Sequence, residues 1–343
     1  MTALNVHAVS KELGGVLVLD DVSLSIPSGT RTALVGESGS GKTTLLRLIA
    51  GFDTPDSGTI ALNDVVISGP QVFIPAHQRG IGYVPQDGAL FPHLTVRQNI
   101  RFGLRRTTQR DQRVKDVCEL VELPADLLNR YPHEISGGQQ QRVAVARALA
   151  PAPDMLVLDE PFSALDTSLR EHARLAVIAA LDATGATSIL VTHDQDEALM
   201  FGQQVGILES GRLLQHGPPT AVFDNPVSPA VAEFLGDVIF LQAHVDGAVA
   251  HTAFGPVRIR HNHAARDGAA RLMLRPDQLQ LHTDQPPNAV IRSVNPRGVR
   301  TILTIESAGS GLRDHVAVEL PADSTYASND IVTIAVTGTG VTY

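Results

Sequence analysis

Short apolar runs rich in β-branched residues alternate with helix-like patterns through the first part of the chain, and each run ends at a turn or a helix-start signal. The clearest runs are Thr32–Val35, Leu156–Leu158, Ser188–Val191 and Val205–Leu208. Alternation of strands with helices is typical of a mainly parallel sheet whose strands are joined by crossover helices. The pattern therefore predicts an α/β fold with its chemistry at the turns that follow the strands.

The strand pattern stops between about residues 87 and 153, where helical periodicity takes over. One apolar set has the spacing of a single helix face: Val114, Val117, Cys118 and Val121. Offsets of three, four and seven residues predict an amphipathic helix, so we expect a helical insert over about 87–153. Because Cys118 lies on the apolar face, we expect a packed core thiol and not a reactive one.

Beyond Gly236 the pattern changes to short alternating runs separated by Gly, Pro, Asn and Asp. These runs are Val257–Arg260, Arg271–Leu274, Val290–Ser293, Thr301–Ile305, Val316–Leu320 and Ile331–Val336. Regularly spaced short strands are typical of an all-β barrel or sandwich. The sequence thus predicts an α/β domain over 1–236 and a small all-β barrel over 237–343, with the boundary near 236–240.

Composition and charge narrow the function classes. A chain of 343 residues with 43% hydrophobic and 18% charged residues suits two globular domains. The net charge of −9 provides no bulk attraction to nucleic acid or to an anionic membrane surface. One cysteine fits a reducing cytosol. No signal peptide or long apolar stretch stands out, so we expect any membrane role to come through partners.

A phosphate-binding loop is predicted directly after the strand Thr32–Val35. The run matches GxxxxGK[ST] and reads Gly36-Glu37-Ser38-Gly39-Ser40-Gly41-Lys42-Thr43, with Thr44 next. Glycines let backbone N–H groups point inward at the start of the following helix, so several donors and a helix N-terminus meet the phosphates together. Lys42 would reach the β- and γ-phosphates, and the Thr43 hydroxyl would bind Mg²⁺.

Two carboxylates end the apolar run Met155–Leu158, where a buried strand is expected to emerge at the phosphate edge of the sheet. Asp159 would hold Mg²⁺ through water. Glu160 is placed to orient, or partly deprotonate, the water that attacks the γ-phosphate. Without other motifs, such a pair would be interpreted as two solvated carboxylates in a turn. The presence of the phosphate loop favours the catalytic interpretation instead.

A second anion cradle is predicted further along the chain, at Ile135 followed by Ser136, Gly137, Gly138 and Gln139. A hydroxyl and free N–H groups at a helix start form such a cradle. The run resembles the signature LSGGQ of the ATP-binding cassette (ABC) ATPases, with Ile in place of Leu. The resemblance implies ATP and Mg²⁺ as cofactors. It also implies a head-to-tail homodimer in which this cradle closes over the nucleotide on the other copy's phosphate loop.

Further landmarks of the ABC family occur in order. Gln86 resembles the Q-loop glutamine that touches Mg²⁺, Ser163–Asp166 resembles the D-loop, and His193 resembles the switch histidine that contacts the γ-phosphate. One departure concerns the adenine. The segment Ser10–Gly15 contains Leu13 where the family has a stacking aromatic ring, so we expect apolar contact with the base without the stacking contribution.

The stand-alone cassette and its C-terminal part, including Leu272–Asp277, resemble the importer ATPases for sugars, sulfate, polyamines and ferric iron. The stretches Tyr83–Val96 and Tyr131–Arg142 look most like ferric-iron import ATPases. The resemblance implies permease subunits gripped through Phe91–Val96, a periplasmic or extracellular solute-binding protein, and a peripheral location on the cytoplasmic face of the membrane.

Three alternatives remain open at this level. The transported solute could instead be sulfate, a polyamine or a sugar. A clamp ATPase acting on nucleic acid is a remote alternative, because the stretch from Thr44 to Ser136 is too short for a long coiled coil; we expect no nucleic-acid partner. Metal sensing by the C-terminal histidines is disfavoured against a solvated loop; these are His251, His261, His263 and His282.

Overall fold

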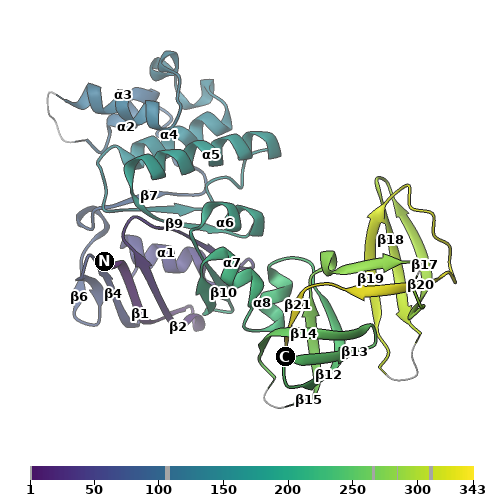
Figure 1. Cartoon of the computed structure of the whole chain (residues 1–343). Coiled ribbons are helices and arrows are strands. Elements are labelled where there is room, and N and C mark those ends of the chain that lie inside the picture. Colours follow the sequence, from purple (N-terminus) through teal and green to yellow (C-terminus); the bar gives the residue numbers. More distant parts are fainter. Residues whose placement is uncertain (1, 105–108, 265–266, 284, 309–311) are drawn as a thin grey trace. The chain divides into compact units, whose positions relative to one another are not determined.

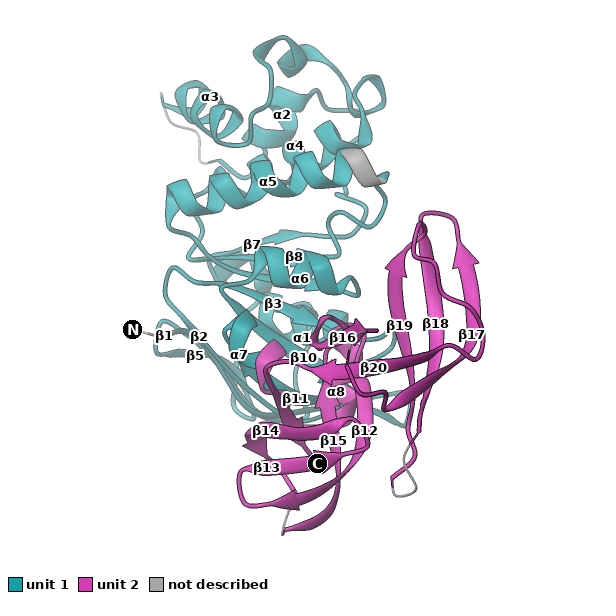
Figure 2. Cartoon of the chain, turned by 45° about the vertical axis from the view of Figure 1, so that its right-hand side comes forward, with its two compact units in different colours: residues 1–222 teal, residues 223–343 magenta. Residues whose placement is uncertain are grey.

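The computed structural model describes the chain except residues 1, 105–108, 265–266, 284 and 309–311, and except the side chains of residues 2, 167 and 168. The described residues form two compact units, residues 1–222 and residues 223–343 (Figure 2). This division falls earlier than the boundary near 236–240 that the sequence predicts.

Arg275 gives a physical reason for the early division. Its buried guanidinium donates hydrogen bonds to four backbone carbonyls of the second unit, those of Phe223, Ala232, Gly236 and Asp237. Buried carbonyls need such donors, and a guanidinium presents five of them in a rigid fork. The segment from Phe223 to Asp237 is therefore held to the unit that carries Arg275.

The first unit opens with an antiparallel sheet in the order β2-β1-β4-β5-β6. Its strands are β1 (Thr2–Leu13), β2 (Val16–Pro27), β4 (Ser57–Leu62), β5 (Val65–Gly69) and β6 (Val72–Phe73). From Val22 onward β2 alternates buried and exposed side chains, so one face of the sheet packs on the core while the other is solvated.

A second sheet carries the predicted parallel strands, in the order β11-β10-β3-β9-β8-β7. Its strands are β3 (Arg31–Val35), β7 (Ile81–Val84), β8 (Met155–Asp159), β9 (Thr187–Thr192), β10 (Gln204–Glu209) and β11 (Arg212–Gly217). All neighbours pair in parallel except β10 with β11. The four apolar runs predicted as strands are β3, β8, β9 and β10, so the α/β prediction is confirmed.

Helix α1 (Lys42–Ala50) contacts β2, β8 and β9, and therefore lies between the two sheets. Its apolar side chains Leu45, Leu46, Leu48 and Ile49 are fully buried, in one core with residues from both sheets. Close packing on both sides fixes the start of α1, and with it the loop that precedes it.

Between β7 and β8 the described residues form helices without a strand. They are α2 (Val96–Arg101), α3 (Arg110–Leu120), η2 (Ala125–Asn129), η3 (Pro132–Glu134) and α4 (Gly137–Leu149). Figure 1 shows α2, α3, α4 and α5 (Thr167–Thr184) gathered together. The predicted apolar face of α3 is buried, and burial raises the pKa of Cys118 to about 11, as expected for a packed thiol.

The remaining helices of the chain are short. They are η1 (Ala76–Gln78), α6 (Gln195–Phe201), α7 (Pro219–Asp224), α8 (Pro229–Phe234) and η4 (Pro276–Gln278). Of these, α6 packs on β3 and β9. Within the described residues, no helix is both long and apolar enough to cross a membrane.

The second unit contains the predicted barrel and a further sheet. The closed barrel has the order β12-β13-β14-β21-β15, from β12 (Ile239–Asp246), β13 (Val249–Thr252), β14 (Gly255–Asn262), β15 (Gly268–Leu274) and β21 (Thr339–Thr342). The sheet has the order β16-β20-β17-β18-β19, from β16 (Leu279–His282), β17 (Ala289–Arg297), β18 (Arg300–Ser307), β19 (His315–Pro321) and β20 (Ile331–Val336). The barrel is confirmed; the sequence did not separate this second sheet from it.

Candidate functional site

The loop between β3 and α1 requires glycine at two positions for different reasons. A Cβ on Gly36 would overlap the carbonyl oxygen of Leu208. Gly41 is the residue before the first turn of α1 and has φ = 101°, a left-handed conformation that glycine adopts without strain. A Cβ there would also lie 2.7 Å from the carbonyl oxygen of Val18. The loop therefore passes close under β2 and β10 before it enters the helix.

Lys42 is folded back onto this loop. Its Nζ donates to the carbonyl oxygens of Gly36 and Glu37, both at 2.8 Å, and to Ser40 Oγ at 3.4 Å. The side chain is only 5% exposed, and burial lowers its pKa although the carboxylates of Glu160 and Asp159 oppose that effect. A buried ammonium held by a curled loop is a preformed site for phosphate oxygens.

Both oxygens of the Asp159 carboxylate have partners. Thr43 Oγ1 donates to Oδ1 at 3.1 Å, and the hydroxyl of Tyr83 donates to Oδ2 at 2.9 Å. Asp159 is 6% exposed at the end of β8, where the parallel sheet opens toward the loop. A threonine hydroxyl beside a carboxylate is an all-oxygen donor set, which is the type Mg²⁺ prefers, so these residues fit that ion.

Glu160 and His193 are brought together from two different turns. His193 Nδ1 donates to Glu160 Oε2 at 3.1 Å. A carboxylate only accepts, so the contact places the proton on Nδ1 and leaves Nε2 available for another group. Glu160 has φ = 44°, and its backbone N–H donates to the carbonyl of Val191 at 2.9 Å. Non-glycine residues in this conformation are uncommon, and they often occur at functional sites.

A hollow of about 230 Å³ lies between the phosphate loop and Glu160. It is lined by Val18, Ser38, Gly39, Gly41, Lys42, Thr43, Thr44 and Glu160. Lys42, the Thr43 hydroxyl that is a candidate Mg²⁺ ligand, and the candidate base Glu160 therefore line the same hollow. The sequence had not singled out Val18.

The Gln86 side chain does not line the hollow and is linked to Glu160 through Ser163. Its Nε2 donates to Ser163 Oγ at 3.2 Å, and Ser163 Oγ donates to the carbonyl oxygen of Glu160 at 3.0 Å. The predicted Q-loop and D-loop are thus linked through a serine hydroxyl to the backbone of the candidate base. Direct contact of Gln86 with Mg²⁺ stays a prediction.

The turn that presents His193 is held by three hydrogen bonds. Thr192 Oγ1 donates to Glu197 Oε2, Asp194 N donates to Thr192 Oγ1 at 3.0 Å, and Glu197 N donates to Asp194 Oδ1 at 2.9 Å. Glu197 is 4% exposed, so this closed set of contacts lies beneath the exposed His193 ring. Sequence reasoning missed Glu197, because a glutamate in the first turn of a helix is usually an exposed residue.

Glu197 makes the stability of the first unit depend on pH. Burial raises the pKa of its carboxyl, Asp194 adds to that effect, and the Thr192 hydroxyl with Arg174 and Arg170 opposes it. The folded chain therefore holds this proton more tightly than the unfolded chain does. Its stabilising contribution is complete below the ordinary glutamate pKa of about 4.3 and is lost as pH rises through the higher folded value.

We expect Glu197→Gln, which cannot ionise, to gain stability relative to the native chain as pH rises through that window. Denaturant unfolding of both proteins at a series of pH values measures the difference. Glu209→Gln, a change at an exposed glutamate, is the matched control. A difference that stays constant from acidic to neutral pH would show that Glu197 does not titrate in this range.

The second predicted anion cradle is built by a capping box. Ser136 Oγ accepts from the N–H of Gln139 at 3.3 Å, and Gln139 Oε1 accepts from the N–H of Ser136 at 2.9 Å. Ser136 and Gly137 are exposed at the start of α4, and Gly138 is buried there. Asp166 caps α5 by accepting from the N–H of Leu169 at 3.0 Å. These residues do not line the hollow at Lys42, so one chain presents two separate cradles.

Leu13 lies at the end of β1, paired with Val16 across the hairpin turn, and is 44% exposed. It is not among the residues that line the hollow at the phosphate loop, where β2 contributes Val18. Contact between Leu13 and the adenine base stays a prediction.

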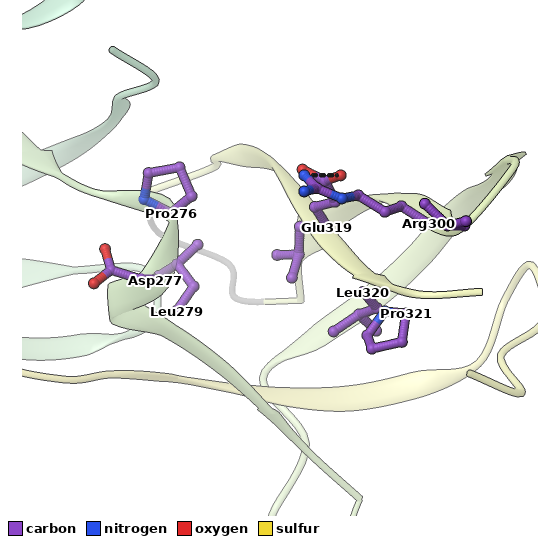
Figure 3. A pocket seen from close by; sticks show the side chains of 9 residues that line it. Pro276, Asp277, Leu279, Arg300, Glu319, Leu320 and Pro321 are labelled. Atoms are coloured by element: carbon purple, nitrogen blue, oxygen red, sulfur yellow. Dashed lines mark hydrogen bonds and ion pairs between the residues drawn. The ribbon is translucent and has the colours of Figure 1, made fainter. Parts of the chain in front are cut away.

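The second unit has an open pocket of about 480 Å³, shown in Figure 3. Arg300 and Glu319, from the neighbouring strands β18 and β19, pair with each other on one side of it at 2.8 Å, while Leu279 and Leu320 contribute apolar lining. The guanidinium at this pocket is therefore already paired.

Among the described residues, no three His, Cys, Asp or Glu side chains are grouped as metal ligands. The rings of His261 and His263 are exposed and stack with their centroids 6.4 Å apart.

Comparison with known proteins identifies the class. The sequence pattern described as "ABC transporter" matches residues 19–163, which include the phosphate loop, the Ser136 cradle and Glu160. Relatives are similar along nearly the whole chain. The chain therefore belongs to the ABC transporter family, and it is a nucleotide-binding ATPase.

Similar proteins of known description indicate which kind of ABC protein the chain resembles. The "Fe(3+) ions import ATP-binding protein FbpC" of Pseudomonas fluorescens is 51% identical over 317 residues, covering 91% of this chain and 89% of that protein. The "Fe(3+) ions import ATP-binding protein FbpC 3" of Rhodococcus jostii is 46% identical over 344 residues, covering 99% of each chain. Similarity at that coverage includes the barrel and the sheet of the second unit.

Two solved structures resemble the first unit. One is a dimeric post-hydrolysis state of an ATP-binding cassette bound to ADP and phosphate, 30% identical with a TM-score of 0.56, which covers 63% of this chain and 98% of that chain. The other is a cassette from Clostridium perfringens, part of an ABC transporter complex, 29% identical with a TM-score of 0.60, covering 65% of this chain and 90% of that one.

Proposed function

We propose that the chain is the ATP-hydrolysing subunit of an importer for Fe³⁺. The observation that carries the proposal is a hollow lined by Lys42, Thr43 and Glu160, with Asp159 hydrogen-bonded to Thr43. The relatives of the chain, similar along nearly its whole length, are described as Fe³⁺ import ATPases. Hydrolysis supplies the energy, and the solute itself would contact other subunits.

The nucleotide would lie with its phosphates in the loop at α1. Lys42 would exchange its bonds to the Gly36 and Glu37 carbonyls for phosphate oxygens, which are stronger acceptors because they are charged. Thr43 and Asp159 would hold Mg²⁺, with Gln86 nearby, and the ion would neutralise phosphate charge. Glu160 would accept a proton from the attacking water, with its carboxylate oriented by His193 Nδ1.

The site becomes complete when two copies meet. Ser136, Gly137, Gly138 and Gln139 form a cradle at the start of α4, where Ser136 and Gly137 are exposed. Such a cradle would bind a phosphate presented from outside the chain. In a head-to-tail pair, each copy's cradle would cover the nucleotide on the other copy's loop, and Asp166 would lie near the junction. The likeness to a dimeric cassette bound to ADP and phosphate supports this arrangement.

Membrane coupling would pass through the segment Phe91–Val96. Asn99, fully buried, receives the N–H of Phe91 and donates to the carbonyls of Phe91, Leu94 and Thr95. The Arg147 guanidinium lies over the Phe91 ring, 5.5 Å from its centroid. A rigid loop of this kind would grip a permease subunit. The chain would then sit at the cytoplasmic face of the membrane, and a solute-binding protein would act on the far side.

Uptake of labelled Fe³⁺ in cells lacking this chain tests the proposal, with labelled sulfate and a polyamine measured in parallel. We expect the native chain to restore iron uptake and the Glu160→Gln chain not to. Restoration of sulfate or polyamine uptake alone would overturn the choice of solute and leave the ATPase assignment in place. Restoration of iron uptake by Glu160→Gln would overturn the role of Glu160.

A further inference from the structure

Tyr83 contacts the site although the sequence analysis gives it no role there. Its hydroxyl donates to Oδ2 of Asp159 at 2.9 Å, while Thr43 occupies Oδ1. The carboxylate is buried, so the direction of its free lone pairs depends on these two donors. Outer contacts of this kind orient the ligands of metal sites and tune their affinity.

The fold fixes the position of the Tyr83 hydroxyl. Tyr83 lies opposite Val157 in the parallel pairing of β7 with β8. Side chains alternate along a strand, so Asp159, two residues after Val157, lies on the same face as Tyr83. The ring spans that two-residue offset, and the Phe52 ring holds it edge-on, with centroids 5.1 Å apart and planes at 77°.

The chemistry of the contact makes Tyr83 the donor. A carboxylate only accepts hydrogen bonds, so the proton of this contact lies on the Tyr83 hydroxyl. A phenol that donates to one carboxylate oxygen fixes the rotation of the carboxylate. The other oxygen is thereby kept facing Thr43, the second predicted ligand of the ion.

We propose that Tyr83 is a positioning residue that donates to Oδ2 of Asp159, keeps Oδ1 directed at Thr43, and so sets the affinity of the divalent-cation site. The inference rests on the proposed function, because the role of Asp159 toward Mg²⁺ is itself part of that proposal. The same bond joins the strand that leads into Gln86 to the metal-binding carboxylate.

The test uses Tyr83→Phe in the full chain, a change that keeps the ring against Phe52 and removes only the hydroxyl. Mn²⁺ binding to the ADP complex is followed by electron paramagnetic resonance, and ADP binding without metal is measured in EDTA. We expect Mn²⁺ affinity to fall about 10- to 100-fold, the usual effect of losing an outer partner of a metal ligand, with metal-free ADP affinity unchanged. Tyr326→Phe, in the second unit, is the matched control.

Asp159→Asn separates the two proposals. If Asp159→Asn weakens Mn²⁺ binding and Tyr83→Phe does not, the inference about Tyr83 is overturned and the metal site stands. If Asp159→Asn leaves Mn²⁺ affinity unchanged, the proposed metal site is wrong. Reduced metal-free ADP affinity in Tyr83→Phe would also overturn the inference, because it would indicate a packing role. Hydrolysis by Tyr83→Phe that recovers at saturating Mg²⁺ would support it.

Discussion

Replacing Glu160 with glutamine is expected to slow ATP hydrolysis by a factor of about 10² to 10⁴, the usual contribution of a positioned general base. Glutamine keeps an oxygen that accepts from His193 Nδ1, so the turn geometry should persist. It cannot take a proton from water. Phosphate release by the full chain with Mg²⁺ and ATP measures the rate, and a separate titration shows that ATP still binds.

Glu233→Gln is the control for this experiment, because it makes the same chemical change at an exposed glutamate of the second unit. Its rate should equal that of the native chain. A Glu160→Gln chain that hydrolyses ATP within a few-fold of the native rate would exclude Glu160 as the base. Loss of ATP binding in that variant would assign Glu160 a structural role at the loop.

Replacing Lys42 with methionine is expected to weaken ATP binding about 10- to 100-fold. Methionine keeps an unbranched apolar stem in the buried position and removes the ammonium that would face the β- and γ-phosphates. Hydrogen bonds to charged groups contribute about 1.5–3 kcal/mol, and each 1.4 kcal/mol changes a dissociation constant tenfold. Isothermal titration with ATP and Mg²⁺ measures the change.

Lys115→Met makes the same replacement at an exposed lysine of α3 and should leave ATP affinity unchanged. The melting temperature of Lys42→Met reports whether the loop still folds, since Lys42 also binds the carbonyls of Gly36 and Glu37. Native-like ATP affinity in a folded Lys42→Met chain would contradict the proposed position of the phosphates.

The sequence predicts those parts of the site that depend on local order along the chain. The loop from Gly36 to Thr43 has fixed spacing between a strand and a helix, and Asp159 with Glu160 follows an apolar run, so the order of residues is enough to place both. The parallel strands and the small barrel were predictable for the same reason, because their hydrophobic patterns are local.

Contacts set by strand register were not predictable in this way. Tyr83 and Asp159 are 76 positions apart, and the bond between them depends on the pairing of β7 with β8. Glu197 is a buried acid that resembles a surface residue of a helix start. In the second unit, strands of the barrel and of the sheet have the same alternating pattern, so only the pairing distinguishes them.

The proposed mechanism depends most on dimer formation, in which the Ser136 cradle of one copy covers the nucleotide bound at the Lys42 loop of the other copy. Light scattering of the Glu160→Gln chain with ATP and Mg²⁺ tests this directly. We predict that ATP doubles the mass from the 36.5 kDa of one chain. The double variant Ser136→Asp, Glu160→Gln should not respond to ATP, because aspartate still caps α4 but repels phosphate. A Glu160→Gln chain that binds ATP and keeps its nucleotide-free mass would contradict the head-to-tail arrangement.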